Sequence, residues 1–598
     1  MTHIIRDSSV GQFIRFATRN RVLQYPEEKP GFKLPESWVQ VLESDPMDSP
    51  SDNSNSTSSN PSVFSPDDEE SQSEKADIID PAPYHATLTR TKSRTESLPY
   101  TEERYQIDQH HELEKTKSIP IVPKKTKDGV ILVDWYYTDD PDNPQNWSNG
   151  RRAAVAIIIC LYTFVVYTSS AIYTTSAEGV MAEFGVNATQ ASLGLALFVL
   201  GYGIGPLAFS PLSELPSIGR NPVYIVTVFL FVIVSIPAAL VENYAGLMVL
   251  RFLQGLFGSP CLANGAASLG DIYSMASFPY ALIAWVSAAY CGPALGPLLS
   301  GFSVPVKGWR WSLLEIIWAA APVFLAMFAV LPETSTPTLL LRRAQRLRKL
   351  TGNDRFMAQS EIDERNLDKK AVLIDALIKP LEITLKDPAI LFVQIYTAII
   401  YGIYYSFFEV FPLVYPVYYG MNYGQLGLVF LCMLVACTLG AGAYIAYLYL
   451  YLDPRIAARG FPAPEARLVP ALGAAFGPTV GLFLFAWTAR PDVHWVVPTL
   501  GITVYGAAVF VVMQCIFVYV PLGYPRYAAS LFAGNDFFRS ALAFASILFA
   551  RPLFANLGVA RGTSLLGGLS TIGIVGIWVL YFYGAKLRSL SKFAVSAE

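Results

Sequence analysis

The sequence predicts an all-α membrane protein with twelve transmembrane helices, arranged as two halves of six helices each. Three observations support this fold class. Of the 598 residues, 53% are hydrophobic and only 15% are charged, whereas soluble domains carry about 25% charged residues. The apolar residues gather in runs of about 20, the length of helix that crosses ~30 Å of hydrocarbon. A polar connector separates the first six runs from the second six.

The apolar runs begin near residue 153 and continue almost to the C-terminus. No cleavable signal peptide precedes the first run, so that run is expected to serve as the targeting signal. In the first half, residues 151–331, the runs cover 153–172, 189–209, 222–241, 246–268, 279–301 and 312–331. In the second half, residues 389–585, they cover 389–409, 424–450, 469–488, 495–519, 528–549 and 564–584.

Three polar segments, residues 1–150, 332–388 and 586–598, lie outside the two halves. The first is expected to be largely disordered, because residues 48–77 are rich in Ser, Asn, Asp and Glu. Lys and Arg concentrate in one alternate set of loops, and the positive-inside rule therefore places all three segments in the cytoplasm. The basic residues include Arg151, Arg152, Arg342, Arg343, Arg346, Arg348 and Lys349.

Hydroxyl groups with basic neighbours in the first polar segment are candidates for phosphorylation. Thr91, Ser93 and Thr95 have this pattern. The alternative is a polar tail without a regulatory role.

Several classes of function are excluded by the sequence. The net charge of −3 gives no sign of nucleic-acid binding. All six cysteines fall inside apolar runs without zinc-type spacing, and His494 is the only histidine in the membrane half, so no metal site is expected. The ATP-binding pattern Gly-x-x-x-x-Gly-Lys-[Ser/Thr] does not occur. An ion gradient, without any cofactor, is therefore the expected energy source.

The fourth run contains a charged residue. Arg251, Gln254, Gly255 and Gly258 occur at i, i+3, i+4 and i+7, so they share one face of a helix. Because charge inside a bilayer is costly, Arg251 is a candidate functional residue. Arginine keeps its proton, but it can stabilise a neighbouring carboxylate or a protonation-dependent polar network. An arginine that only fixes helix packing is the alternative.

The fifth run combines small residues with two prolines: Ala288, Gly292, Pro293, Gly296 and Pro297. Proline removes a backbone hydrogen bond, and glycine permits close contact with a neighbouring helix. The pattern predicts a pivot beside a site at the middle of the membrane.

The short loop between the second and third runs carries opposite charges. Glu214 and Arg220 flank Gly219, and Asp271 follows the fourth run on the same side of the membrane. These residues predict a charge-assisted latch between helix ends. A solvated pair of loop charges is the alternative.

These three segments resemble the signature motifs of the major facilitator superfamily. The loop resembles the motif between its helices two and three, the Arg251 segment its fourth-helix motif, and residues 288–297 the fifth-helix motif of its antiporters. Residues 140–147, 308–311 and 331–334 are similar to fungal twelve-helix drug:proton antiporters, the branch of cycloheximide, benomyl and azole resistance pumps. The resemblance extends from about residue 140 to the C-terminus.

The chain departs from the family pattern in the loop and in the fifth run. Four residues rather than two separate Glu214 from Gly219, and the acid is glutamate where the family has aspartate. Ala288 stands where the fifth-helix motif commonly has glycine. The first departure leaves the register of the latch open, whereas the second keeps a small residue.

Two acidic residues are candidates for proton carriage. Asp536 lies within a run, three residues before Arg539, and this spacing favours a permanently ionised bridge on one helix face. Glu409 ends the seventh run and is the alternative: it is a candidate to titrate or, as a residue of the substrate cavity, to bind a cationic substrate. An interfacial glutamate in water is the other interpretation. Aromatic residues of the same run, which offer flat apolar faces to a substrate, are candidates for the cavity lining: Tyr401, Tyr404, Tyr405 and Phe408.

The resemblance implies a monomeric plasma-membrane transporter that is not an enzyme. It would export diverse small amphipathic compounds, such as azoles, in exchange for protons by alternating access between the two halves. The alternatives are an exporter restricted to a self-made toxic metabolite, a polyamine or nutrient transporter on the same fold, and a transporter-like sensor. An enzyme would show clustered histidines or paired acids in the spans, and the sequence has none.

Overall fold

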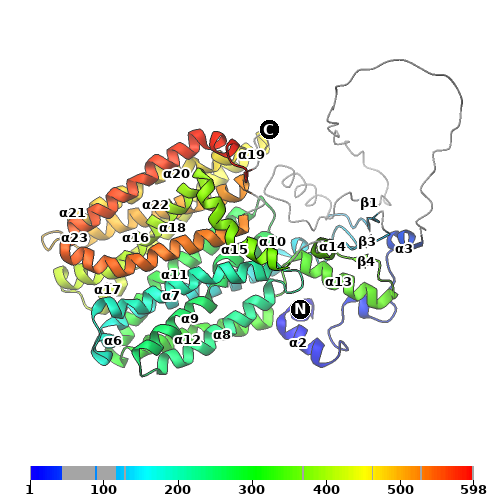
Figure 1. Ribbon diagram of the computed structural model, residues 1–598, viewed down its shortest axis with the longest axis horizontal. Helices are drawn as coiled ribbons and strands as arrows, with labels where there is room; N and C mark the ends of the chain where they lie inside the picture. The colour runs from blue at the N-terminus through cyan, green and yellow to red at the C-terminus, as the bar shows by residue number, and fades with distance from the viewer. Residues whose placement is uncertain are drawn as a thin grey trace, which may run out of the picture.

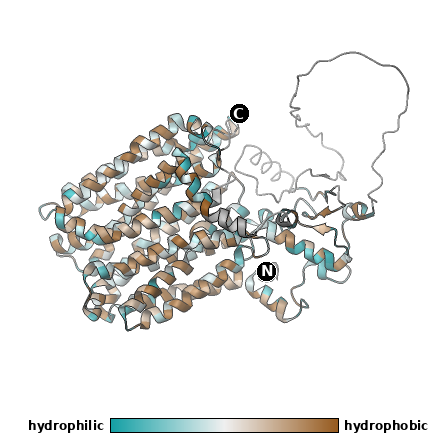
Figure 2. Ribbon diagram, in the orientation of Figure 1, coloured by the Kyte–Doolittle hydropathy of each residue, from teal (hydrophilic) through white to brown (hydrophobic). Residues whose placement is uncertain are grey.

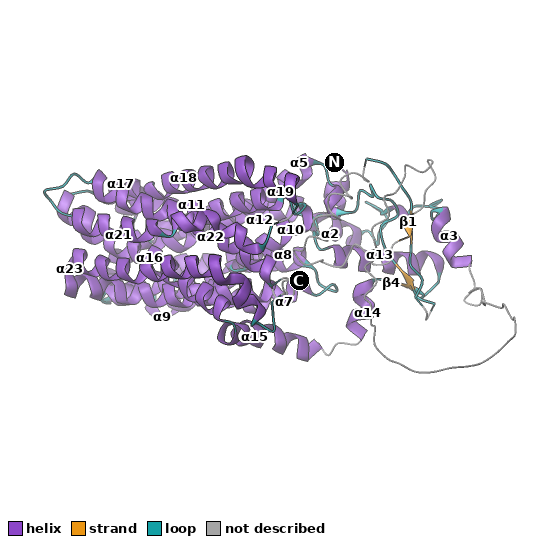
Figure 3. Cartoon of the chain, turned by 90° about the horizontal axis from the view of Figure 1, so that it is seen from above, coloured by secondary structure: helices purple, strands orange, loops and turns teal. Residues whose placement is uncertain are grey.

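The computed structural model describes residues 2–43, 88–89, 116–126, 129–365, 369–460, 462–524 and 528–594. Long helices lie side by side in one bundle, and a smaller layer of short helices and strands covers one end of it (Figures 1 and 3). Both chain termini lie at that same end (Figure 1). The Ser-rich tract at 48–77 and the hydroxyls Thr91, Ser93 and Thr95 lie outside the described residues.

The first half contains six membrane-length segments. The fourth and fifth correspond to the runs that carry the motifs near residues 251 and 292. The segments are α5 (Asn149–Ala171) continued by η3 (Ile172–Ser176) and α6 (Ala177–Phe184), α7 (Ala188–Glu214), α8 (Arg220–Leu240), α9 (Tyr244–Gly258) with α10 (Pro260–Ile272), α11 (Phe278–Lys307), and α12 (Arg310–Val330).

The second half repeats this count. Its helices are α16 (Pro388–Tyr419), then α17 (Tyr423–Val429), α18 (Cys432–Tyr447), η4 (Leu448–Leu452) and α19 (Asp453–Arg459) as one segment, η5 (Pro464–Leu468), α20 (Val469–Ala474) and α21 (Phe476–Thr488) as the next, α22 (Val496–Gly523), and α23 (Ala528–Ser589). Apolar residues dominate along these helices, and polar residues increase in the layer at the end of the bundle (Figure 2).

Helix α23 accounts for two crossings. Its 62 residues are interrupted at Gly558, which has φ 77° and ψ 160°, a conformation that glycine adopts without steric cost. An unbroken helix of this length would measure about 93 Å, roughly three bilayer cores. Among the described residues eleven helical segments are long and apolar enough to span a membrane, and the break at Gly558 divides the last of them. The predicted count of twelve crossings is therefore confirmed.

The layer at the end of the bundle joins the N-terminal segment to the connector between the halves. Parallel strand pairs link β1 (Leu88–Thr89) to β2 (Ile121–Val122), and β3 (Ile131–Leu132) to β4 (Phe356–Met357). Trp38, Tyr136 and Phe356 pack together in a small separate core. The helical elements of the layer are α1 (Thr2–Asp7), α2 (Ser9–Ala17), η1 (Pro26–Glu28), α3 (Glu36–Glu43), η2 (Pro144–Asn146), α13 (Thr336–Thr351), α14 (Gln359–Arg365) and α15 (Lys369–Lys386).

Residues 2–43, 116–126 and 129–150 of the N-terminal segment, which was expected to be largely disordered, are ordered and include helices and strands. These residues are polar overall, so they cannot fold around an apolar core of their own. They fold instead on the connector helix α13, which supplies both apolar contacts and buried charge.

Arg343 of α13 is the centre of this charge network. Its side chain is 1% exposed, and its guanidinium donates to Asp140 at 2.7 Å and to Asp142 at 3.0 Å. It also lies 3.4 Å from Glu27. Burial by itself would raise the pKa of the Asp142 carboxyl, but Arg343 and Arg6 outweigh it and hold that pKa below its ordinary value. The resulting stability is complete above the unfolded pKa of about 3.9 and is lost as the pH falls through the lower folded value.

We expect Arg343→Ala to release the N-terminal segment. The substitution leaves carboxylates buried without their partner, which costs about 3 kcal/mol or more. Limited proteolysis of the full-length protein should cut the first 43 residues faster in this variant. Neighbouring Arg342→Ala is the matched control, because Arg342 is 31% exposed and reaches Glu333 only at 4.0 Å. Equal cleavage of the two variants would contradict this account.

Candidate functional site

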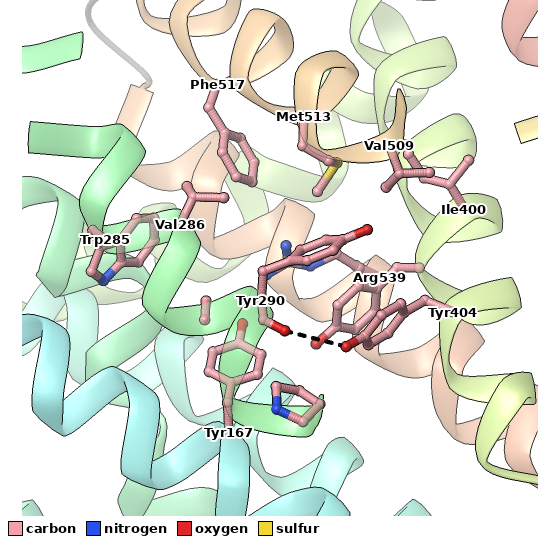
Figure 4. A pocket seen from close by; sticks show the side chains of 13 residues that line it. Tyr167, Trp285, Val286, Tyr290, Ile400, Tyr404, Val509, Met513, Phe517 and Arg539 are labelled. Carbon is pink, nitrogen blue, oxygen red and sulfur yellow. Dashed lines mark hydrogen bonds between the residues drawn. The ribbon is translucent and has the colours of Figure 1, made fainter. Parts of the chain in front are cut away.

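A cavity lies between the two halves of the bundle (Figure 4). Its volume is about 50 Å³. Helices α5 and α11 line it from the first half, and α16, α22 and α23 from the second. The lining residues are Tyr167, Trp285, Val286, Ala289, Tyr290, Pro293, Ile400, Tyr401, Tyr404, Val509, Met513, Phe517 and Arg539.

The lining is aromatic with a single charged residue. The rings of Tyr290 and Tyr404 lie 5.4 Å apart, and the Tyr404 hydroxyl donates to the Tyr290 carbonyl at 3.4 Å (Figure 4). Tyr290 also donates to the Gly506 carbonyl of α22 at 3.0 Å. Tyr290 thus joins one half of the bundle to the other at the wall of the cavity.

Close packing of α11 on α5 positions this wall. A Cβ atom at Gly292 would lie 2.7 Å from the Cβ of Tyr167 and 2.8 Å from the Phe164 carbonyl oxygen, and one at Gly296 would lie 2.7 Å from the Ile172 nitrogen. Neither glycine leaves room for a side chain. Pro293 lines the cavity, and α11 continues through it as one helix of 30 residues.

The remaining residues of the fifth-run motif lie on the same helix. Pro297 is buried, and Ala288 is half-buried. The predicted motif is therefore assembled along α11, whereas its action as a pivot stays a prediction.

Hydroxyl groups from three helices meet beside the cavity. Tyr202 of α7 hydrogen-bonds both Tyr401 and, at 3.0 Å, Tyr405 of α16. Tyr405 also lies 3.2 Å from the Ser170 hydroxyl of α5. Because Tyr202 and Ser170 belong to the first half and the other two to the second, this tyrosine cluster connects the halves by hydroxyl groups that can each donate and accept a hydrogen bond.

The predicted pair of Asp536 and Arg539 is confirmed as an ion pair. The two side chains form a charged hydrogen bond and are each 6% exposed. The Arg539 guanidinium lies 4.5 Å from the centre of the Tyr401 ring, so the pair adjoins the tyrosine cluster. Among the described residues Arg539 Nε and Asn535 Oδ1 are buried without a hydrogen-bond partner.

Arg251 occupies a separate polar centre within the first half. It is fully buried and donates to the backbone carbonyls of Gly194 at 3.0 Å and of Ser169 and Ser170 at 3.2 Å. It also donates to Gln254 at 3.1 Å. Within the described part of the chain it has no carboxylate partner. Arg251 therefore reaches the tyrosine cluster through Ser170, which bonds Tyr405.

The glycines of the fourth-run motif bring α9 against its neighbours. A Cβ atom at Gly255 would lie 2.0 Å from the Phe198 carbonyl oxygen of α7, and one at Gly258 would lie 2.9 Å from Val166 of α5. The shared face predicted for Arg251, Gln254, Gly255 and Gly258 is thus the buried face of α9.

We expect Gly255→Ala to abolish surface expression or transport. Its new methyl group would overlap backbone, which cannot give way as a flexible side chain can. Gly442→Ala on α18 is the matched control, since nothing lies within 4 Å of the Cβ position there. Surface labelling and efflux would be measured for both, and a fully active Gly255→Ala variant would contradict the close packing of α7 and α9.

The predicted latch forms between Arg220 and Asp271. The Arg220 guanidinium donates to both carboxylate oxygens, at 2.7 and 3.2 Å. Gly219, with φ 86°, starts α8 in a conformation that favours glycine. Glu214 lies exposed at the end of α7 and makes no ion pair among the described residues, although it is close enough to Arg220 for the two charges to interact.

Glu333 provides the second acid of the latch, and the sequence reasoning missed this role. Its carboxylate is 2% exposed and accepts from the backbone nitrogens of Arg220 at 3.1 Å and Asn221 at 3.2 Å. These are the orphan donors at the start of α8. Glu333 follows the sixth apolar run directly, and this position of an acid could have indicated its role from the sequence.

Of the residues predicted to line the cavity, some line it and the others lie outside it. Tyr401 and Tyr404 line the cavity as expected. Tyr405 lies behind them in the tyrosine cluster, and Phe408 stacks on Phe430 at 5.2 Å. Glu409 is 8% exposed rather than in water, and it accepts from Ser192 of α7 at 2.8 Å, so it joins the halves outside the cavity.

Known proteins share the sequence pattern and the fold of this chain. The sequence pattern of the Major Facilitator Superfamily matches residues 159–547. An MFS-type transporter, pyvG, of Aspergillus violaceofuscus is 47% identical over 79% of this chain and 87% of its own. Fluconazole resistance protein 1 of Saccharomyces cerevisiae is 40% identical over 78% of this chain and 86% of its own. The crystal structure of a POT family transporter has a TM-score of 0.53 at 10% identity, covering 75% of this chain and 99% of that one.

Proposed function

Because the chain belongs to the major facilitator superfamily, and to the part of it that includes fungal drug-resistance transporters, we propose that it exports small amphipathic compounds across the plasma membrane in exchange for protons. It would act as a monomer, with both termini in the cytoplasm. Membership makes it a transporter of small molecules rather than an enzyme, as the sequence indicated.

The lining of the cavity is the observation that carries the proposal. It offers flat aromatic faces with a single ion pair at the edge, which suits lipophilic compounds recognised by contact area rather than by fixed hydrogen-bond geometry. The face of Tyr401 is occupied by Arg539, whereas Tyr290 and Tyr404 are available to a substrate. The name of the Saccharomyces cerevisiae relative supports azole-like substrates.

The polar groups beside the cavity support proton coupling. Asp536 is a titratable group at the interface between the halves, and the tyrosine cluster next to it crosses that interface. Protonation of Asp536 would remove its attraction for Arg539 and change the network that holds the halves together. Since 100 mV of membrane potential supplies about 2.3 kcal/mol per proton, this input is sufficient for uphill export.

Efflux from yeast cells that lack their own pumps tests the proposal. Cells expressing the protein would be loaded with a rhodamine-type dye or a fluorescent azole, with and without a protonophore. We expect expression to increase the rate of dye loss and the protonophore to abolish the increase. If the protein reaches the cell surface but the cells export neither lipophilic cations nor azoles, broad export is contradicted. That result would favour a transporter of one metabolite.

A further inference from the structure

Helix α2 buries its polar side and exposes its apolar side, whereas a helix on a water-soluble domain does the reverse. Its polar side faces inward, because Arg15 is 5% exposed and binds Glu28 through two contacts of 2.7 Å. Its apolar side faces outward, since Phe13 is 65% exposed and Phe16 is 83% exposed. Phe13, Phe16 and the exposed Ala17 occur at i, i+3 and i+4, so they form one stripe.

Helix α2 lies against the ends of two membrane-length helices. Figure 1 shows α2 beside the ends of α8 and α12. Ser9 donates to Asn221 in the first turn of α8 at 2.5 Å, and Ser8 pairs with Pro332 directly after α12. Further along, the outer faces of these two helices carry exposed apolar residues such as Val226 and Leu325, which are the lipid-facing surface. The stripe on α2 therefore starts at the edge of that surface.

The charges around α2 suit an anionic surface. Two acids that flank α2 in the sequence are paired with arginines: Asp7 binds Arg6 and Arg151, and Glu28 binds Arg15. Arg19 and Arg21 follow the helix, are exposed, and have no ion-pair partner among the described residues. An apolar stripe bordered by free arginines is the pattern of a helix that lies in a lipid interface.

We propose that α2 is a membrane-surface anchor: Phe13 and Phe16 enter the bilayer leaflet on the side of the chain termini, and Arg19 and Arg21 bind its anionic headgroups. The anchor holds the folded N-terminal segment, and through Arg343 the connector between the halves, against the membrane. A partner protein or a second copy of the chain would cover the same stripe without contacting lipid, and the experiment distinguishes these occupants.

Lipid contact can be measured on the full-length protein in vesicles. A bimane fluorophore would be attached at Phe16→Cys and, separately, at Gln40→Cys, and the vesicles would carry lipids brominated near the glycerol end of their acyl chains. Gln40 is exposed on α3, which lies at the far end of the layer from the bundle in Figures 1 and 3. Labelled wild type gives the background from the native cysteines, and Phe13→Cys provides a second position on the stripe.

We expect brominated lipid to quench the label at Phe16 at least twice as strongly as the label at Gln40. In vesicles containing phosphatidylserine, adding Arg19→Glu and Arg21→Glu should reduce that quenching toward the Gln40 level, with a smaller change in neutral vesicles. Equal quenching at the two positions would overturn the anchor. It would also be overturned if the Phe16 label were shielded from aqueous iodide only at high protein density, because that result identifies a second copy as the occupant.

Discussion

Replacing Arg251 by alanine is expected to abolish export while leaving the cavity lining in place. The guanidinium donates to the carbonyls of Gly194, Ser169 and Ser170, so its loss removes three charged hydrogen bonds. Each hydrogen bond to a charged group contributes about 1.5–3 kcal/mol, and the carbonyls lie on the two helices α5 and α7 that meet the tyrosine cluster. A loss of about tenfold or more in the efflux rate corresponds to only ~1.4 kcal/mol, which this damage exceeds.

Arg251→Lys separates charge from geometry in the same experiment. Lysine keeps the positive charge, but its single ammonium group cannot hold carbonyls on two helices as the planar fork of arginine does. We therefore expect Arg251→Lys to be nearly as inactive as Arg251→Ala. Both variants would be compared at equal surface expression and with binding of a fluorescent substrate measured in detergent. Full activity of the lysine variant would show that charge alone is required.

The helices themselves could be predicted from the sequence, because a bilayer imposes one requirement on length and hydrophobicity. Short-range pairs could be predicted too. Asp536 and Arg539 are three residues apart on one helix, and their ion pair follows from that spacing. Arg220 and Asp271 are the charged residues of neighbouring loops on one side of the membrane, so their contact also follows.

The residues that line the cavity could be predicted only in part. Membrane helices are apolar on every side, so the sequence does not show which side of each helix faces the cavity. Tyr401 and Tyr404 face the cavity, whereas Tyr405 and Phe408 of the same run do not. The contact of Tyr202 with Tyr401 joins residues 199 positions apart, and no local pattern encodes it. Packing of Gly292 against Tyr167 decides which part of α11 reaches the cavity.

The folded N-terminal segment was missed for a different physical reason. Its residues are polar, and composition alone predicts disorder when a segment cannot bury enough apolar surface. Here the missing stabilisation comes from outside the segment: Arg343 of the connector binds Asp140 and Asp142 and approaches Glu27. Such a network satisfies each buried charge only after the two distant segments have come together.

Asp536→Asn is expected to uncouple transport from the proton gradient. The amide has nearly the shape of the carboxylate, but it does not gain or lose a proton at physiological pH. It also leaves Arg539 with a buried, uncompensated charge. Uphill efflux should fall by about tenfold or more, and the remaining dye movement should no longer respond to an imposed pH gradient. The measurement is dye flux in vesicles containing purified protein, with the inside and outside pH set independently.

The double variant Asp536→Asn, Arg539→Gln decides between the two roles of this carboxylate. It removes both charges, so the buried pair is replaced by two neutral amides and the cost of an unpaired arginine disappears. If Asp536 carries the coupled proton, the double variant recovers stability and substrate binding but still ignores the pH gradient. If the pair is only a structural bridge, the double variant recovers pH-driven uphill export as well, and the proton site must then lie elsewhere, with Glu409 as the next carboxylate to replace. Glu409→Gln is tested in the same vesicles as the competing carboxylate, because Glu409 is also buried and bonded to a neighbouring helix. If Glu409 carries the proton, Glu409→Gln ignores the pH gradient while the double variant still follows it.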